Sequence, residues 1–158
     1  MRITFVHNDR ERTVEADPRD TLLHHLHPGG DQEGACLNGR CLRCSVLLSG
    51  RVVPACQVPI FRVEGQTVRD IDGLEHDSLY RDIRKAFDKI GISRCREALP
   101  ALAMLAYQLL SEVSMPTDSD LRDYSRHITS RCVSRDEFER ATRLAGRVQK
   151  RRRNEQPR

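Results

Sequence analysis

Four cysteines in the first half of the chain constrain its fold more than any other feature of the sequence. They are Cys36, Cys41, Cys44 and Cys56, with the spacing C-x4-C-x2-C-x11-C. The short spacings allow one loop to carry the first three thiols around a shared centre. The fourth thiol lies beyond a predicted strand and fixes that loop to a sheet. Because thiolates bind soft metals and iron–sulfur clusters, the pattern predicts a fold organised around such a centre.

The spacing is typical of a two-iron, two-sulfur (2Fe-2S) cluster. In the plant-type arrangement, four thiolates complete a tetrahedral sulfur environment around each iron. Gly39, between the first two cysteines, can adopt backbone angles closed to other residues and bring amide N–H groups toward sulfur. Gly34 and the loop backbone are expected to contribute in the same way. Such bonds stabilise the reduced cluster and raise its potential. We therefore predict one 2Fe-2S cluster held by Cys36, Cys41, Cys44 and Cys56.

Two other thiol chemistries fit the pattern less well. Cys41 and Cys44 form one C-x2-C knuckle, but a structural zinc site usually pairs two such knuckles. A Rieske centre needs two histidine ligands, and no histidine lies inside the motif. Disulfides are rare in the reducing cytoplasm, where we expect this chain. Zinc and a disulfide pair remain the alternatives to a cluster.

The distribution of charge and hydrophobicity bears on location and partners. Residues 1–15 mix charged with alternating apolar residues, unlike a signal peptide, and the apolar run 98–110 is too short to cross a bilayer. We therefore expect a cytoplasmic protein without membrane insertion. The net charge of +4 comes from the end of the chain, where residues 147–158 hold six Lys or Arg and one Glu. This basic tail is expected to be a solvated helix end, and nucleic acid is not an expected partner.

The period of the apolar residues divides the chain near residue 75. Alternating patterns predict hairpins that turn at Asn8-Asp9-Arg10 and at Ser49-Gly50, and a short helix through 22–26 ends before Pro28-Gly29-Gly30. Beyond Leu74 the period becomes helical. The predicted helices cover 78–90 and 96–113, then begin at Thr117 or Asp118 and at Ser134. The fold class is α+β, with a first domain at 1–75, a helical domain at 76–150 and a basic tail at 151–158.

With these motifs in place, the chain resembles the small iron–sulfur subunit of the molybdenum hydroxylases, the family of xanthine dehydrogenase, carbon monoxide dehydrogenase and aldehyde oxidoreductase. The matching segments are Thr21-Leu22-Leu23, Glu33-Gly34, Cys36…Gly39…Cys41…Cys44-Ser45-Val46, Gly50, Cys56, Ile71-Asp72-Gly73-Leu74, Arg84-Lys85-Ala86-Phe87 and Met115-Pro116-Thr117. The resemblance extends from about residue 3 to about residue 142. It implies an N-terminal β-grasp, ferredoxin-like 2Fe-2S domain followed by a C-terminal four-helix bundle.

The sequence departs from this family in the helical domain. The resemblance implies a second cluster there, bound by C-x2-C and a later C-x-C. Cys95 and Cys132 match the first and last of these ligands, but Ala98 and Ser130 occupy the other two positions. An alanine methyl group cannot bind iron. We therefore expect the second cluster to be absent, with Cys95 and Cys132 as small buried side chains. The family's glycine after the second cysteine is Leu42 here.

The expected function is one-electron transfer through a single cluster, as the small subunit of an oxidoreductase complex of molybdenum hydroxylase type. The implied partners are larger subunits that bind molybdopterin, flavin or both. No nucleophile–base pair, phosphate loop or paired carboxylates stand out, so the chain is expected to carry no substrate chemistry of its own. His24, His25 and His27 are expected to be surface or capping groups and not metal ligands. The alternatives are a free-standing ferredoxin-like electron carrier and a non-redox structural or assembly module.

Overall fold

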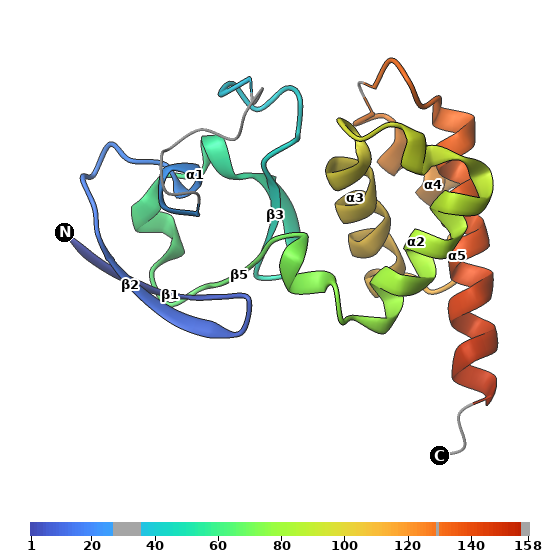
Figure 1. Ribbon diagram of the computed structural model, residues 1–158, viewed down its shortest axis with the longest axis horizontal. Coiled ribbons are helices and arrows are strands. Elements are labelled where there is room, and N and C mark those ends of the chain that lie inside the picture. Colours follow the sequence, from blue (N-terminus) through green and yellow to red (C-terminus); the bar gives the residue numbers. More distant parts are fainter. Residues whose placement is uncertain (27–35, 129, 156–158) are drawn as a thin grey trace. The chain divides into compact units, whose positions relative to one another are not determined.

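The chain divides into two compact units, Met1–Leu74 and Glu75–Arg158. The computed structural model describes residues 1–26, 36–128 and 130–155 (Figure 1). The predictions for His27, the Pro28-Gly29-Gly30 turn and Gly34 therefore lie outside the described residues.

The first unit is built on a mixed five-stranded sheet of order β2-β1-β5-β3-β4. Its strands are β1 Arg2–His7, β2 Arg10–Glu15, β3 Ser45–Leu48, β4 Arg51–Pro54 and β5 Thr67–Arg69. The pairs β1–β2, β3–β4 and β3–β5 are antiparallel, and β1–β5 is parallel. Both predicted hairpins are confirmed. Their turns, Asn8-Asp9 and Ser49-Gly50, take positive φ, as two-residue turns that follow the twist of the strands often require.

The core of the first unit lies between this sheet and the short helix α1 Leu22–Leu26. Ile3 and Phe5 point inward from β1 because alternate residues of a strand face the same side. Leu22 and Leu23 of α1 are fully buried against them. The core also includes Cys44 and Cys56, so two of the candidate ligands lie in well-packed surroundings.

The second unit consists of four α-helices within its described residues. They are α2 Ser78–Ile90, α3 Leu99–Glu112, α4 Asp118–Ser125 and α5 Arg135–Glu155. Helix α2 packs against α3 and α5, and α4 packs against α3 and α5. The central α3 is apolar around most of its circumference and has eight buried residues. Helix α3 therefore forms the interior of the helical unit.

The helix ends follow local capping chemistry. Asp77 accepts hydrogen bonds from the amides of Leu79 and Tyr80 at the start of α2. Thr117 is the N-cap of α4 and forms a reciprocal capping box with Asp120. A second reciprocal pair precedes α5, where the amides of Ser134 and Glu137 each donate to the other's side chain. This capping box confirms the helix start predicted at Ser134.

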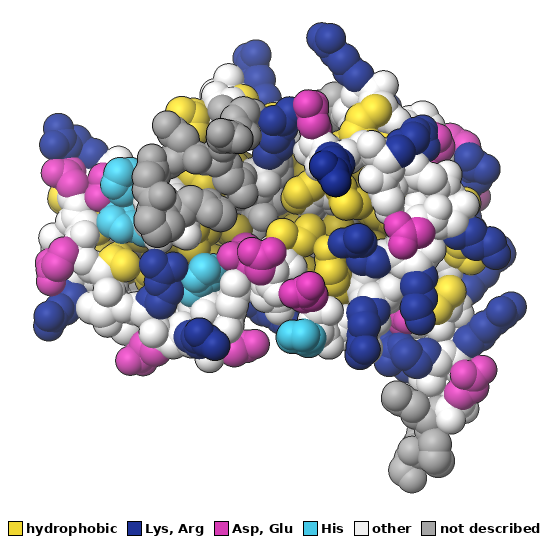
Figure 2. All heavy atoms as spheres, viewed as in Figure 1, with side chains coloured by type: hydrophobic (Ala, Val, Ile, Leu, Met, Phe, Trp, Pro, Cys, Tyr) yellow, Lys and Arg dark blue, Asp and Glu magenta, His cyan; other side chains and the backbone are white. Residues whose placement is uncertain are grey.

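The described residues form a mixed sheet-and-helix fold, as the change of hydrophobic period predicted. Helix α5 continues through residues 151–155, within the segment expected to be a basic tail. On the face seen in Figure 2, Lys and Arg side chains are interspersed with Asp and Glu. Among the described helices, none combines the length and the apolar character needed to cross a membrane.

Candidate metal centre

Three of the four predicted ligands lie in the loop that leads to β3, and the fourth lies in a 3₁₀ turn of the same unit. Cys36 and Cys41 lie half-buried in the loop that leads to β3. Cys44 immediately precedes β3 and is 3% exposed, and Cys56 lies in the 3₁₀ turn η1, Ala55–Gln57, and is 5% exposed. All four are free thiols. The amide of Ala55 donates to the carbonyl oxygen of Cys44 at 2.9 Å, which joins the segments that carry the two buried cysteines.

The loop folds so that backbone amides point at sulfur. The amides of Arg40 and Cys41 each donate to Cys36 Sγ at 3.2 Å, and the amide of Cys36 donates to Cys41 Sγ at 3.4 Å. The Cys44 thiol interacts with the thiol and backbone of Cys56 and with the Cys41 side chain. The structure thus arranges the thiols as two pairs, Cys36 with Cys41 and Cys44 with Cys56, and the interaction of Cys44 with Cys41 links the pairs. Among the described residues, no three His, Cys, Asp or Glu side chains are grouped as ligands of a single metal ion.

These surroundings shift the pKa values of Cys36, in the loop, and of buried Cys44 in opposite directions. Amide donors, first that of Cys41 and then that of Asn38, lower the pKa of Cys36 to about 6. Burial raises the pKa of Cys44 to about 11 because the apolar core disfavours a thiolate. Without metal at neutral pH, Cys36 is therefore mainly a thiolate and Cys44 a thiol. Metal ligation requires deprotonated thiols, so binding at this site should release protons.

We expect the two thiols of the metal-free protein to be alkylated in different pH ranges. The thiolate is the reactive form, so iodoacetamide modification of Cys36 should rise as pH increases through about 6. Modification of Cys44 should stay slow until pH approaches about 11. Peptide mass spectrometry measures the modification of each cysteine. The control is the protein unfolded in urea, where both thiols should have a pKa of about 8.5. Matching pH profiles in the folded protein would contradict this electrostatic description.

Gln57 is a site residue that the sequence analysis missed. Its Nε2 donates to the carbonyl oxygens of Leu37 at 3.0 Å and Cys56 at 3.1 Å, and to Cys56 Sγ at 3.7 Å. It therefore ties the first cysteine loop to the fourth cysteine. Gly39 lies under this side chain with φ +75°, and a Cβ there would come within 2.8 Å of Gln57 Cγ. Both the backbone conformation and the contact favour glycine at this position.

Two leucines of the loop have backbone conformations that leucine rarely adopts. Leu37 and Leu42 both have φ near +56°, a region that costs about 1–2 kcal/mol for a residue with a side chain. Leu42 occupies the position where the family resemblance implies glycine. The backbone at this position therefore has the positive φ that suits glycine, although the residue is leucine. In this turn, the amide of Ser45, the residue after Cys44, donates a hydrogen bond to the carbonyl oxygen of Leu42 at 3.0 Å.

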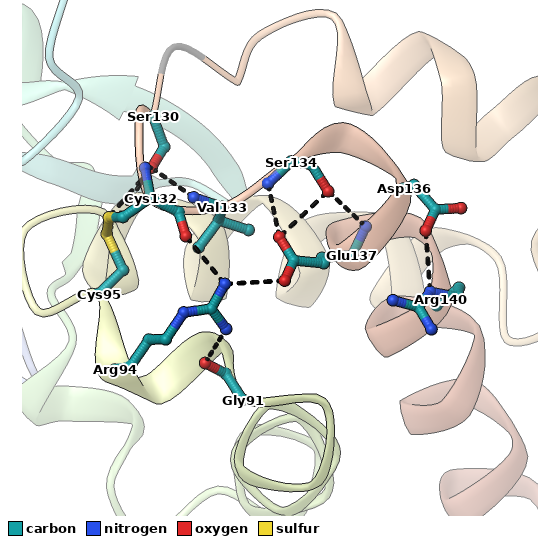
Figure 3. A network of polar contacts seen from close by, with 10 residues as sticks. All are labelled: Gly91, Arg94, Cys95, Ser130, Cys132, Val133, Ser134, Asp136, Glu137 and Arg140. Carbon is teal, nitrogen blue, oxygen red and sulfur yellow. Dashed lines mark hydrogen bonds and ion pairs between the residues drawn. A yellow bond between two sulfur atoms is a disulfide. The ribbon is translucent and has the colours of Figure 1, made fainter.

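The helical unit also brings its two cysteines together. Cys95 and Cys132 form a disulfide with a Cα–Cα distance of 5.9 Å (Figure 3). Cys95 is 3% exposed, but Cys132 is exposed. The expectation of two small buried thiols is therefore wrong, because the pair is bonded and one member faces solvent. Ser130 Oγ lies 3.6 Å from Cys95 Sγ and 3.4 Å from Cys132 Sγ, whereas Ala98 is the N-cap residue of α3 and offers no ligand atom.

Fold and site together define a small two-unit protein, with four free cysteines on a mixed-sheet unit and a disulfide on a helical unit. No protein-family model matches the sequence. The chain is 27% identical over 129 residues to the nicotine 6-hydroxylase small subunit of Paenarthrobacter nicotinovorans, covering 80% of this chain and 78% of that one. It is 32% identical over 93 residues to the aldehyde oxidoreductase iron-sulfur-binding subunit PaoA of Escherichia coli K12, covering 56% of this chain and 40% of that one.

A solved structure gives the same result over nearly the whole chain. The aldehyde oxidoreductase from Desulfovibrio gigas superimposes with a TM-score of 0.81 at 25% identity, over 96% of this chain and 17% of that chain. The homologues of this chain are thus small iron–sulfur subunits and domains of molybdenum hydroxylases, as the sequence resemblance predicted. This chain corresponds to a small part of the longest of these proteins.

Proposed function

We propose that this chain binds one 2Fe-2S cluster through Cys36, Cys41, Cys44 and Cys56 and relays single electrons as the small subunit of a molybdenum hydroxylase-type oxidoreductase. The observation that carries the proposal is the set of four free cysteines whose loop directs amide donors at sulfur. When bound, the cluster supplies a one-electron couple. The chain's own residues hold it, supply hydrogen bonds to its sulfur ligands and limit its contact with water.

The donor set fits an iron–sulfur cluster. All four candidate ligands are thiols, which is the set that [2Fe–2S] centres use. Two linked thiol pairs suit a cluster that divides its ligands between two irons. The amides of Arg40 and Cys41, together with the Gln57 side chain, supply N–H groups to sulfur. Such donors favour the reduced cluster.

We propose that the two units are a β-grasp, ferredoxin-like domain and a four-helix bundle. The sheet order with a parallel β1–β5 pair and α1 against its core supports a β-grasp, ferredoxin-like domain over residues 1–75. Helices α2 to α5 support a four-helix bundle over 76–150 that continues into the basic segment 151–158. A second cluster is not expected in the bundle, because Ala98 provides no ligand and Cys95 and Cys132 are bonded to each other.

The partners we propose are larger subunits that bind molybdopterin, flavin or both, in the cytoplasm. The chain covers 17% of the D. gigas aldehyde oxidoreductase, so a complete enzyme of that kind requires further polypeptide. The described residues of the first unit contribute ligands and packing, which suits a relay of electrons between partners. We propose that substrate chemistry resides in those partners.

An anaerobic redox titration of the holo chain tests the function. Stepwise reduction followed by reoxidation should transfer about one electron per cluster reversibly, with bleaching and recovery of the visible absorption. A tagged chain expressed with its native neighbours should elute with a larger flavin- or molybdopterin-containing chain. Elution of the native chain alone would favour a free-standing carrier, and the absence of reversible reduction would favour a structural module. Either result would contradict the proposed subunit role.

Gln57→Leu should lower the reduction potential of the bound cluster. The leucine is similar in size but cannot donate to Cys56 Sγ or to the carbonyl oxygen of Leu37. Loss of an N–H···S bond removes a group that favours the reduced state, and loss of the loop contact should speed iron release. A redox titration followed by EPR measures the potential. Gln66→Leu, the same change at an exposed residue of this unit, is the control, and equal potentials in the two variants would argue against this role.

A further inference from the structure

We propose that Cys95 and Cys132 form a reversible thiol–disulfide exchange site that accepts two electrons from a dithiol reductant. This site is separate from the four cluster ligands and from the one-electron chemistry proposed for them. The observations behind it are the unequal exposure of the two cysteine residues, the hydroxyl group next to both sulfurs, and an arginine that joins the two segments independently of the disulfide (Figure 3).

The unequal exposure sets the order of the reaction. Cys132 lies in an exposed turn before α5, whereas Cys95 is 3% exposed after the 3₁₀ turn η4, Ile92–Arg94. An external thiolate can therefore reach the sulfur of Cys132. Its attack forms a mixed disulfide with Cys132 and breaks the Cys95–Cys132 bond, and the bonding electron pair leaves on Cys95 Sγ. The second thiol of the reductant then displaces Cys132, and the reductant is released as its own disulfide.

Ser130 is placed to donate to the leaving sulfur. Its Oγ accepts hydrogen bonds from the amides of Cys132 and Val133, both at 3.2 Å. These contacts use the acceptor capacity of the hydroxyl, so its O–H is left to donate. The two nearby acceptors are the sulfurs of Cys95 at 3.6 Å and Cys132 at 3.4 Å. Donation to the thiolate that leaves on Cys95 is stronger than donation to a disulfide, so Ser130 speeds the opening of the disulfide.

Arg94 can keep the two cysteine segments in place when the disulfide opens. Its guanidinium donates to the carbonyl oxygens of Gly91 at 2.5 Å and Cys132 at 3.1 Å, and it pairs with Glu137 Oε1 at 2.8 Å. The amide of Ser134 and the Arg94 guanidinium hold the pKa of Glu137 to about 2, so this ion pair persists at neutral pH. The two sulfurs therefore remain close enough to bond again. Over the whole reaction, the dithiol reductant gives two electrons and two protons to the Cys95–Cys132 disulfide and becomes a disulfide itself.

Equilibration of the full holo chain in mixtures of reduced and oxidised dithiothreitol tests the proposal. After an acid quench and alkylation, mass spectrometry of the peptides that carry Cys95 and Cys132 should show both thiols appearing together and disappearing on reoxidation. Helical circular dichroism should be retained throughout. If the pair stays reduced in oxidised dithiothreitol, or opens only when the helical unit unfolds, the proposal is wrong.

Single substitutions test the roles of the two sulfurs and of Ser130. In Cys95→Ser, Cys132 should form a mixed disulfide with oxidised glutathione, and in Cys132→Ser, Cys95 should react at least about tenfold more slowly. Ser130→Ala should slow the reduction of the pair by dithiothreitol, and Ser130→Thr should restore the rate. Ser93→Ala, which removes a hydroxyl that bonds Asp88 instead, is the control. Equal reactivity of the two cysteines, or no difference between Ser130→Ala and Ser93→Ala, would overturn the assignment.

Discussion

Cys44→Ala is expected to abolish cluster binding, reducing iron from about two atoms per chain to near none. Cys44 is 3% exposed at the edge of the core, and alanine supplies no atom that can bind iron. The remaining three thiols leave one iron with an incomplete sulfur environment. Alanine fits a buried site of this size, so the sheet itself should still fold. Iron analysis and the visible absorption of the purified protein measure the effect.

The matched control removes cysteines without touching the proposed cluster site. The double variant Cys95→Ala/Cys132→Ala lacks the disulfide of the helical unit but keeps all four cysteines of the first unit. It should retain iron and visible absorption at the level of the unchanged protein. Full iron in Cys44→Ala would contradict the ligand assignment, and loss of iron only in the double variant would move the metal to the helical unit.

Met104→Ala is expected to lower the free energy of unfolding of the helical unit by about 2–5 kcal/mol. Met104 is fully buried on α3, which contacts α2, α4 and α5. The change removes buried apolar surface and leaves a cavity that a well-packed interior closes only in part. Urea unfolding followed by far-ultraviolet circular dichroism measures the loss, with the helical signal used to separate this unit from the sheet unit.

Met115→Ala provides the comparison in the same unit. Met115 is 47% exposed before α4, so the same substitution removes little buried surface and should change the free energy by no more than about 0.5 kcal/mol. The contrast depends on burial alone, since the side chains deleted are identical. Equal losses in the two variants would show that the packing around α3 does not stabilise this unit as described.

Local chemistry made much of the fold predictable. Asn8-Asp9 and Ser49-Gly50 combine residues that tolerate positive φ, and both form hairpin turns. The spacing of apolar residues predicted α2 with its observed bounds, Ser78–Ile90. The start of α5 at Ser134 was also predictable, because its capping box involves only residues three apart.

Other features depend on contacts between distant residues and had no local signal. Gln57 meets Leu37 across 20 residues, and the Cys95–Cys132 disulfide joins positions 37 apart. Helix α5 continues into the basic segment, where Arg152 pairs at 2.9 Å with the buried Asp82 of α2, 70 residues away. The sequence showed a run of positive charge there, but only the packing of α5 on α2 gives one of these charges a buried partner.

Iron and acid-labile sulfide per chain, with an EPR spectrum after dithionite reduction, show whether the four cysteines of the first unit hold a 2Fe-2S cluster. We expect about two irons, about two sulfides and one rhombic S = 1/2 signal from anaerobically purified protein. Zinc or no metal would contradict the assignment of Cys36, Cys41, Cys44 and Cys56 to a cluster. About four irons with two signals would instead show that the helical unit binds a second cluster despite Ala98 and the Cys95–Cys132 disulfide.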